Sequence, residues 1–325
     1  MKRREFLGLA AGAGTSWPFA ARAQQAKRML RVGAAGVSPR SSSYYVAFER
    51  RMAELGYREG DIFTFDHVQA DDKNKTIDAA YREIAERKPD ILLASGTEAN
   101  LKSALATSET TPIVMLAVSY DPLALGYVAS LARPGGRVTG LVLQQIELTR
   151  KRVQLLKEAI PDMTSAILFF DRYSGDQWKA AEDAGARLGV RLSGIDLRDP
   201  PYDYDRALAQ APTNNRANLL VPTSPRILAD RERLAQFALR NRLASMFTYR
   251  PWVDAGGLMS YGQSIDGMFR QIADVVDQIA RGAKPADLPI QQPTKFEFVI
   301  NLSTARALGI ELSPSLLARA DEVIE

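Results

Sequence analysis

Small polar residues follow three apolar, strand-like runs in the first half of the chain. They are Ser38 and Ser41 after "LRVGAA", Ser95, Gly96 and Thr97 after "DILLA", and Ser119 and Asp121 after "IVMLAV". Hydroxyls and the free amides of a helix start favour a carboxylate, glycine permits close backbone approach, and an aspartate can accept a hydrogen bond from an ammonium group. Simpler roles remain open, because Thr97 and Asp121 also suit helix capping and serine is common in turns.

The second half of the chain offers a comparable set of hydroxyl, aromatic and acidic residues. They are Tyr173, Ser174, Asp176, Ser224, Tyr249 and Tyr261, most of them in the loops "DRYSGD" (171–176), "VPTSPR" (221–226) and "TYRPW" (248–252). Arg172, Arg226 and Arg250 stand in the same loops and either pair with an acidic ligand or act as surface charges. The aromatic residues favour an aromatic or amphipathic ligand.

Residues for catalysis or metal binding are scarce. The chain has one histidine, His67, and no cysteine, so thiol catalysis and the common zinc sites are excluded. No G-x-S-x-G, P-loop or EF-hand pattern occurs, and His67 in "TFDHVQA" is read as a surface or strand-packing residue. Spacing alone leaves a catalytic pair of carboxylates open, although Asp199, Asp203 and Asp205 are read as loop and helix-start residues. We expect no catalytic residue, no metal and no cofactor.

The elements that must position these residues alternate between strand and helix. Strand-like runs occur at 29–35, 62–70 and 90–95, in "PIVMLAV" and in "RVTGLVLQ", and helical patterns lie between them, the last of these at "PLALGYVASL". A second β-α series runs from a helix at 147–160 to a helix at 227–242 and the strand "ASMFTY". This order predicts an α/β fold of two Rossmann-like lobes with parallel sheets, joined near residues 140–146.

The last quarter adds elements of the same kind. "GGLMSYG" is read as one more strand with Tyr261 near its end, and residues 264–285 as a long amphipathic helix closed by Gly282 and Pro285. Residues 295–301 alternate strictly, and Ser303 is the expected N-cap of the last helix. No lysine follows the glycines of "AGGLMSYGQS", so this stretch does not resemble a phosphate loop.

The N-terminus is typical of an export signal. "MKRREFLGLAAGAGTSWPFAARAQQ" has a basic start, an apolar stretch and an Ala21-Arg22-Ala23 cleavage site, and "RREFL" matches the twin-arginine pattern. We expect residues 1–23 to be removed and the mature chain to be periplasmic, without a lipid anchor. The segment also carries much of the formal charge of +4, so nothing indicates nucleic-acid binding.

Several long segments resemble the ABC-transporter substrate-binding proteins related to the tryptophan/tyrosine-type binding proteins. They are "AFERRMAELGYREG" (47–60), "ASLARPGGRVTGL" (129–141), "DAGGLMSYG" (254–262) and the C-terminal stretch 280–325. The resemblance implies a type I periplasmic-binding-protein fold, with two lobes, three crossing segments and a ligand in the cleft. It places lobe one at 28–142 and 254–290, and lobe two at 143–253 and 291–325.

The resemblance also implies a function without chemistry. A monomeric receptor would close around a small organic ligand, an amino acid or an aromatic or carboxylate compound, and deliver it to ABC permease subunits in the inner membrane. Hinge closure would involve the crossings near 140–146, 250–256 and 290–295. Two other functions stay open at this point: a sensor subunit that reports ligand to a membrane receptor, and a secreted hydrolase or lyase.

Overall fold

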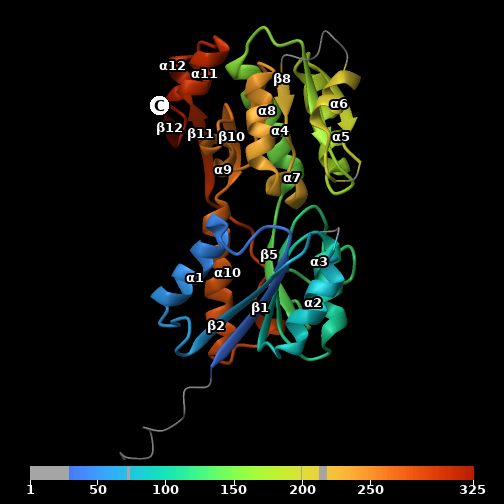
Figure 1. The fold of residues 1–325 in the computed structure, drawn as a ribbon, viewed down its shortest axis with the longest axis vertical. Helices are drawn as coiled ribbons and strands as arrows, with labels where there is room; N and C mark the ends of the chain where they lie inside the picture. The colour runs from blue at the N-terminus through green and yellow to red at the C-terminus, as the bar shows by residue number, and fades with distance from the viewer. Residues whose placement is uncertain (1–28, 72–73, 199, 212–217) are drawn as a thin grey trace, which may run out of the picture.

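The computed structural model describes residues 29–71, 74–198, 200–211 and 218–325, and within them the chain forms two α/β lobes stacked along the long axis (Figure 1). Each lobe is built on one sheet, five-stranded in lobe one and seven-stranded in lobe two. The predicted signal peptide, residues 1–23, lies outside the described residues.

Lobe one contains a parallel sheet in the order β2-β1-β3-β4-β5. Its strands are β1 (Leu30–Gly36), β2 (Phe63–Gln69), β3 (Ile91–Gly96), β4 (Ile113–Ala117) and β5 (Val138–Val142). Helices α1 (Ser43–Glu54) and α10 (Ile265–Ala280) pack together beside the sheet, while α2 (Ile77–Glu86) and α3 (Glu98–Thr107) pack together apart from them (Figure 1). The sheet therefore has helices on both faces, which buries its strands.

Lobe two repeats this order and extends it. Its sheet reads β7-β6-β8-β9-β10-β11-β12, and the first five strands follow the same 2-1-3-4-5 pattern as lobe one. The strands are β6 (Ser165–Phe170), β7 (Arg191–Asp196), β8 (Asn218–Leu220), β9 (Ala244–Phe247), β10 (Met259–Gln263), β11 (Phe296–Asn301) and β12 (Glu322–Ile324). β11 runs antiparallel to β10, whereas the other described pairs are parallel.

The remaining helices belong mostly to lobe two. They are α4 (Gln145–Ala159), α5 (Gly175–Arg187), α6 (Tyr204–Gln210), α7 (Pro225–Ala229), α8 (Arg231–Arg240), α9 (Arg250–Asp254), α11 (Leu302–Leu308) and α12 (Pro314–Leu317), and a 3-10 turn, η3 (Pro285–Asp287), precedes the last crossing. The single helix predicted at 227–242 is thus two helices that meet at Asp230.

Three crossing segments join the lobes, and hydrogen bonds hold them side by side. Next to the β5–α4 crossing, the amide of Val142 donates to the carbonyl of Gln291 over 3.0 Å, and the side chains of Gln144 and Gln292 are bonded over 2.9 Å. The amide of Ser264, between β10 and α10, donates to the carbonyl of Lys295 over 3.2 Å. All three crossings are short, so the lobes are joined at one compact place.

The placement of β10 differs from the prediction. The expected return into lobe one at residue 254 occurs only after Gln263, because β10 pairs with β9 and β11 in the lobe-two sheet. The glycines of this stretch serve close packing. A Cβ on Gly262 would lie 2.1 Å from the carbonyl oxygen of Thr248, and one on Gly257 would lie 2.5 Å from the ring of Phe247. Any larger residue would push the strands apart.

Two local predictions are also wrong. "PLALGYVASL" forms turns and not a helix: Gly126 has φ +76, and the amide of Tyr127 returns to the carbonyl of Pro122 to close the segment. The helix α11 begins earlier than expected, so its N-cap is Asn301 and not Ser303. The side chain of Asn301 accepts the amide of Thr304 over 2.8 Å.

Candidate ligand-binding site

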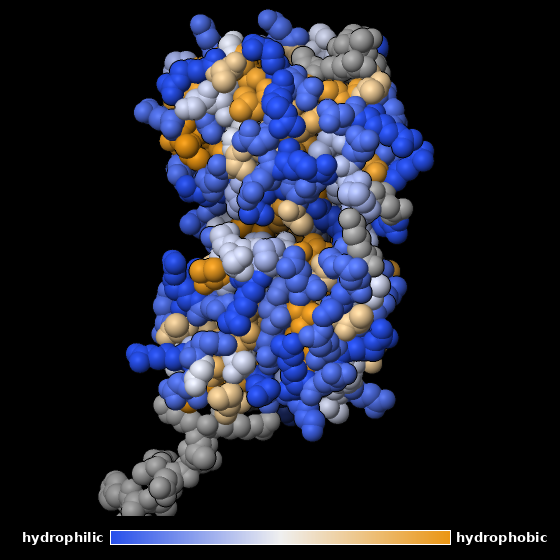
Figure 2. Space-filling view, in the orientation of Figure 1, coloured by the Kyte–Doolittle hydropathy of each residue, from blue (hydrophilic) through white to orange (hydrophobic). Residues whose placement is uncertain are grey.

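A cavity lies between the lobes at the carboxyl ends of the parallel strands. It encloses about 830 Å³ of empty space, part of it open to solvent, and residues of both lobes line it. In the space-filling view, apolar surface shows at the bottom of the groove between the lobes (Figure 2). Its position, at the strand ends and between two lobes, is that of a small-molecule site in an open α/β fold.

The lobe-one wall is made by the loops after β1 and β3. Ser38 follows β1, and Ser95, Gly96 and Thr97 lead from β3 into α3. Gly96 has φ +130, a conformation that favours glycine, and a Cβ there would crowd Oδ1 of Asn100 at 3.0 Å. Thr97 occupies the N-cap position of α3 without a side-chain cap bond, and its hydroxyl is 3.3 Å from the Asn100 Oδ1.

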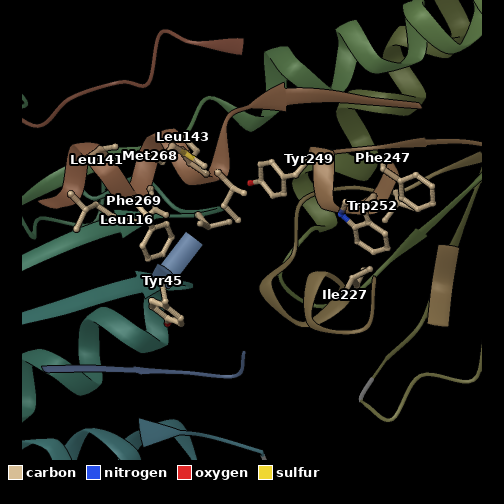
Figure 3. Packing of buried hydrophobic residues seen from close by; sticks show 14 of the residues in the cluster. Tyr45, Leu116, Leu141, Leu143, Ile227, Phe247, Tyr249, Trp252, Met268 and Phe269 are labelled. Atoms are coloured by element: carbon tan, nitrogen blue, oxygen red, sulfur yellow. The ribbon is translucent and has the colours of Figure 1, made fainter. Parts of the chain in front are cut away.

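Aromatic rings form much of the remaining surface. Tyr44 and Tyr45 of α1 pack on Phe269 of α10, with ring centroids 4.6 and 5.3 Å away, and all three line the cavity. Tyr249 extends from lobe two toward Met268, with its hydroxyl leading (Figure 3). Burial raises the pKa of Tyr45 well above its ordinary value, so this phenol is neutral. The cavity therefore presents flat, apolar faces to a ligand.

The lobe-two wall rests on a buried carboxylate that sequence reasoning passed over. Asp171, directly after β6, is fully buried and accepts hydrogen bonds from the hydroxyls of Tyr202 and Ser174, both 2.8 Å, and from the amide of Tyr173 over 3.0 Å. The hydroxyl of Ser224 also donates to it. This network fixes Tyr173 and Ser224, which line the cavity. The sequence feature that points to Asp171 is its position as a charged residue immediately after the apolar run "SAILFF".

A fully buried arginine, Arg152 of α4, stands behind the lobe-two wall. Its Nε donates to the carbonyl of Tyr261 over 2.7 Å, and its other nitrogens lie 3.4 Å from Oγ1 of Thr149 and Oε1 of Gln145. Burial lowers its pKa to about 10, which still leaves the guanidinium charged at neutral pH. The cation also acts electrostatically on the cavity-lining Tyr249, whose pKa it lowers against the larger raising effect of burial.

One family model covers most of the chain. Residues 41–324 match the model described as ABC transporter substrate binding protein. The chain belongs to this family of ABC transporter substrate-binding proteins. A tyrosine-binding protein of Clostridioides difficile (strain R20291) is 21% identical to it over 274 residues, which cover 81% of this chain and 76% of the relative.

Solved structures show the same fold for this substrate-binding protein. A conserved domain protein of Vibrio cholerae superposes with a TM-score of 0.81 at 22% identity, covering 91% of this chain and 100% of the other. An ABC domain in complex with L-Trp from Streptococcus pneumoniae gives a TM-score of 0.77 at 18% identity, with the same coverage. The two-lobed architecture is a type I periplasmic-binding-protein fold, as the sequence indicated.

Seven of the ligand-binding residues predicted from the sequence of this substrate-binding protein line the cavity. Those that line the cavity are Ser38, Ser95, Gly96, Thr97, Tyr173, Ser224 and Tyr249. Ser41 lines a neighbouring hollow beside α1, and Ser119 and Asp176 line another one that shares Thr97 and Tyr173 with the main cavity.

Three other predicted residues lie elsewhere in the substrate-binding protein. Asp121 is exposed and accepts the amides of Leu123 and Ala124 over 2.8 and 3.1 Å, so it caps its own turn. Ser174 is fully buried in the Asp171 network. Tyr261 stacks on Phe296 within lobe two, with ring centroids 6.2 Å apart. None of these three side chains is among those lining the cavity in the described residues.

The described part of the substrate-binding protein offers few groups for a metal site or a membrane crossing. No cluster of three or more histidine, cysteine or acidic side chains suited to a metal occurs within the described ranges. His67 packs edge-on against Tyr45, with ring centroids 4.7 Å apart. Over the same part of the chain, none of the helices combines the length and apolar character that a membrane crossing needs.

Proposed function

We propose that this protein is the periplasmic solute receptor of an ABC importer, and that it binds a small organic ligand between its lobes without transforming it. The observation that supports this most directly is the cavity at the lobe interface, to which each lobe contributes strand-end loops. A site built from two halves binds a ligand tightly only when the two lobes come together. Ligand binding is therefore coupled to the relative position of the lobes.

Hinge closure is the expected mechanism. The three short crossings lie side by side, so one lobe can rotate relative to the other with few backbone changes. A ligand that contacts both the Ser95–Thr97 loop and the Ser224 loop interacts more strongly with the closed form, and it shifts the population by that difference in affinity. The closed form would then be the state recognised by the permease subunits.

Amino acids and aromatic or carboxylate compounds are the proposed ligand classes. The relatives named above include a tyrosine-binding protein and a structure with L-Trp, and the cavity here is lined by Tyr44, Tyr45, Tyr249 and Phe269. The sequence of residues 1–23 supports export to the periplasm, and we propose that the receptor acts there as a monomer.

Small-angle scattering with and without ligand tests this function. A thermal-shift panel of amino acids, organic acids, sugars and nucleosides identifies a ligand, and saturation with it should reduce the radius of gyration. A cavity-filling variant, Ser95→Trp, should abolish both responses, whereas Ser303→Trp on the exposed surface should not. An unchanged envelope at saturation would rule out closure, and turnover of the ligand would contradict a receptor without chemistry.

A further inference from the structure

Gln145 lies where a crossing segment enters lobe two. It is the first residue of α4, directly after the β5–α4 crossing, and its side chain is buried. Its Oε1 accepts a hydrogen bond from the hydroxyl of Thr223 over 2.7 Å, and Thr223 lines the ligand cavity. One side chain therefore joins the hinge to the lobe-two wall of the cavity.

Gln177 holds the other side of Thr223. Its Nε2 donates to the Thr223 carbonyl and its Oε1 accepts the Thr223 amide, both over 2.8 Å, and the same Nε2 reaches the Ser119 hydroxyl of lobe one over 3.1 Å. Gln145, Thr223 and Gln177 are each at most 3% exposed, so these bonds are shielded from water. A continuous chain of hydrogen bonds thus runs from the crossing segment to the opposite lobe.

Arg152 ties this chain to a second crossing. Its Nε donates to the carbonyl of Tyr261 over 2.7 Å, close to the end of β10, and its Nη2 lies 3.4 Å from Oε1 of Gln145. Because a guanidinium only donates hydrogen bonds, it fixes which end of the Gln145 amide acts as the acceptor. A longer route also leads from Arg152 through Thr149 to Oε1 of Gln177, with steps of 3.4 and 3.5 Å.

Buried polar groups that share partners in this way move together. Without the Gln145 acceptor, the Thr223 hydroxyl would be buried with its bond broken, and the wall loop would have to shift to satisfy it. Such a shift carries the Gln177 amide away from Ser119, because Gln177 is bonded to both backbone groups of Thr223. The hydrogen bond across the cleft then depends on a hinge residue that takes no part in it.

We propose that Gln145 is a positioning residue that couples the hinge to lobe closure. It holds Thr223 and Gln177 in the arrangement that bonds to Ser119, and each bond of the chain joins two protein groups, so part of the receptor closes before any ligand binds. This rests on the proposed receptor function and deepens it, because the apparent affinity rises with the fraction of receptor already in the binding-competent form. A ligand that contacts Thr223 would act on the crossing segments through the same bonds.

A double-mutant cycle on the distance between the lobes tests this coupling. The chain has no cysteine, so Lys102→Cys on α3 and Lys179→Cys on α5, both exposed, can carry a pair of spin labels. Pulsed electron spin resonance on the mature protein without ligand then gives the ratio of closed to open forms. Ser119→Ala should lower this ratio roughly 2- to 10-fold, as expected for one hydrogen bond. Gln145→Leu should lower it by a similar factor, and adding Ser119→Ala should then change it less than about twofold.

Matched variants separate this coupling from general damage to the fold. Thr223→Val removes the same hydrogen bond from its other end and should reproduce the effect of Gln145→Leu. Gln145→Glu keeps an acceptor oxygen for Thr223 and Arg152, and it should retain the dependence on Ser119. Gln154→Leu on the exposed side of α4 should change neither the ratio nor the effect of Ser119→Ala.

Three results would overturn the inference. They are equal effects of Ser119→Ala in the wild type and in Gln145→Leu, which is the additive behaviour of independent residues, no effect of Ser119→Ala in the wild type, and a wild type with no closed form in the absence of ligand. The receptor function would survive each of them if a compound from the thermal-shift panel still reduced the radius of gyration.

Discussion

Gln177 in lobe two donates a hydrogen bond from Nε2 to the hydroxyl oxygen of Ser119 in lobe one, over 3.1 Å. The same amide group is held in place within lobe two, because its Nε2 reaches the carbonyl of Thr223 over 2.8 Å and its Oε1 accepts the Thr223 amide over 2.8 Å. Gln177 thus links a loop of the cavity wall to the opposite lobe. Such a bond exists only while the lobes are together.

Loss of the Ser119 hydroxyl should weaken ligand binding. A single hydrogen bond contributes about 0.5–1.5 kcal/mol, so we expect Ser119→Ala to raise the dissociation constant roughly 2- to 10-fold by destabilising the closed form. Ser119 has φ +59, and Ser119→Gly therefore provides a matched control that also removes the hydroxyl but relieves the backbone. If only the alanine variant binds more weakly, backbone strain and not the bond is responsible.

Replacing Asp171 by asparagine should destabilise lobe two. An asparagine amide group would place a donor against hydroxyls and an amide that already donate, and a buried network left partly unsatisfied costs about 1–3 kcal/mol of unfolding free energy or more. Urea denaturation measures the change, and Asp183→Asn on the exposed face of α5 is the control. Equal stability of Asp171→Asn and the wild type would show that the network reorganises without cost.

Gly96→Ala should impair binding and stability together. The residue is at φ +130, and the added Cβ would crowd Oδ1 of Asn100, so we expect a loss of about 1–3 kcal/mol in stability and a clear loss of affinity. Gly136→Ala, where no neighbour lies within 4 Å of the added atom and no positive φ is recorded, is the matched control. Retained affinity in Gly96→Ala would place the ligand away from this loop.

His67 should make stability depend on pH in a defined window. Burial lowers its pKa from 6.5 to about 4, so between these values the unfolded chain binds a proton that the folded chain does not. The contribution of His67 to the unfolding free energy is complete above pH 6.5 and is lost as the pH falls toward 4. It amounts to about 1–2 kcal/mol after allowance for partial solvent exposure. His67→Gln should lack this part of the pH profile when unfolding free energies are measured from pH 4 to 8.

Local patterns predicted most of the secondary structure because apolar periodicity and strand-ending loops are properties of short segments. The lobe to which β10 belongs is set by pairing with β9 and β11, and β11 is more than thirty residues away along the chain. No pattern within "GGLMSYG" carries that information. The same limit explains "PLALGYVASL", where helical spacing is overridden by the turn that ends at Gly126.

The candidate site was predictable in outline for the same reason. Polar residues at strand ends were found because parallel strands bring their carboxyl ends to one edge, and this places Ser38, Ser95 and Thr97 in the cavity wall. Whether a side chain faces the cavity depends on its local bonds. Asp121 caps a turn, and Ser174 donates to Asp171. These local hydrogen bonds occupy the side-chain oxygens that would otherwise be available to a ligand. Arg152 and Gln177 lie within helices, where no strand-end rule applies.

Neither lobe is a continuous segment, and this has a consequence for synthesis. The apolar face of α1, with Tyr45, Phe48 and Met52, is covered by α10, which follows all of β6–β10 in the chain. A growing polypeptide therefore carries an uncovered aromatic surface on its first lobe while most of the second lobe is being made. The β10 edge likewise stays unpaired until β11 is made. Until α10 and β11 have been made, both surfaces are therefore open to contacts with other chains.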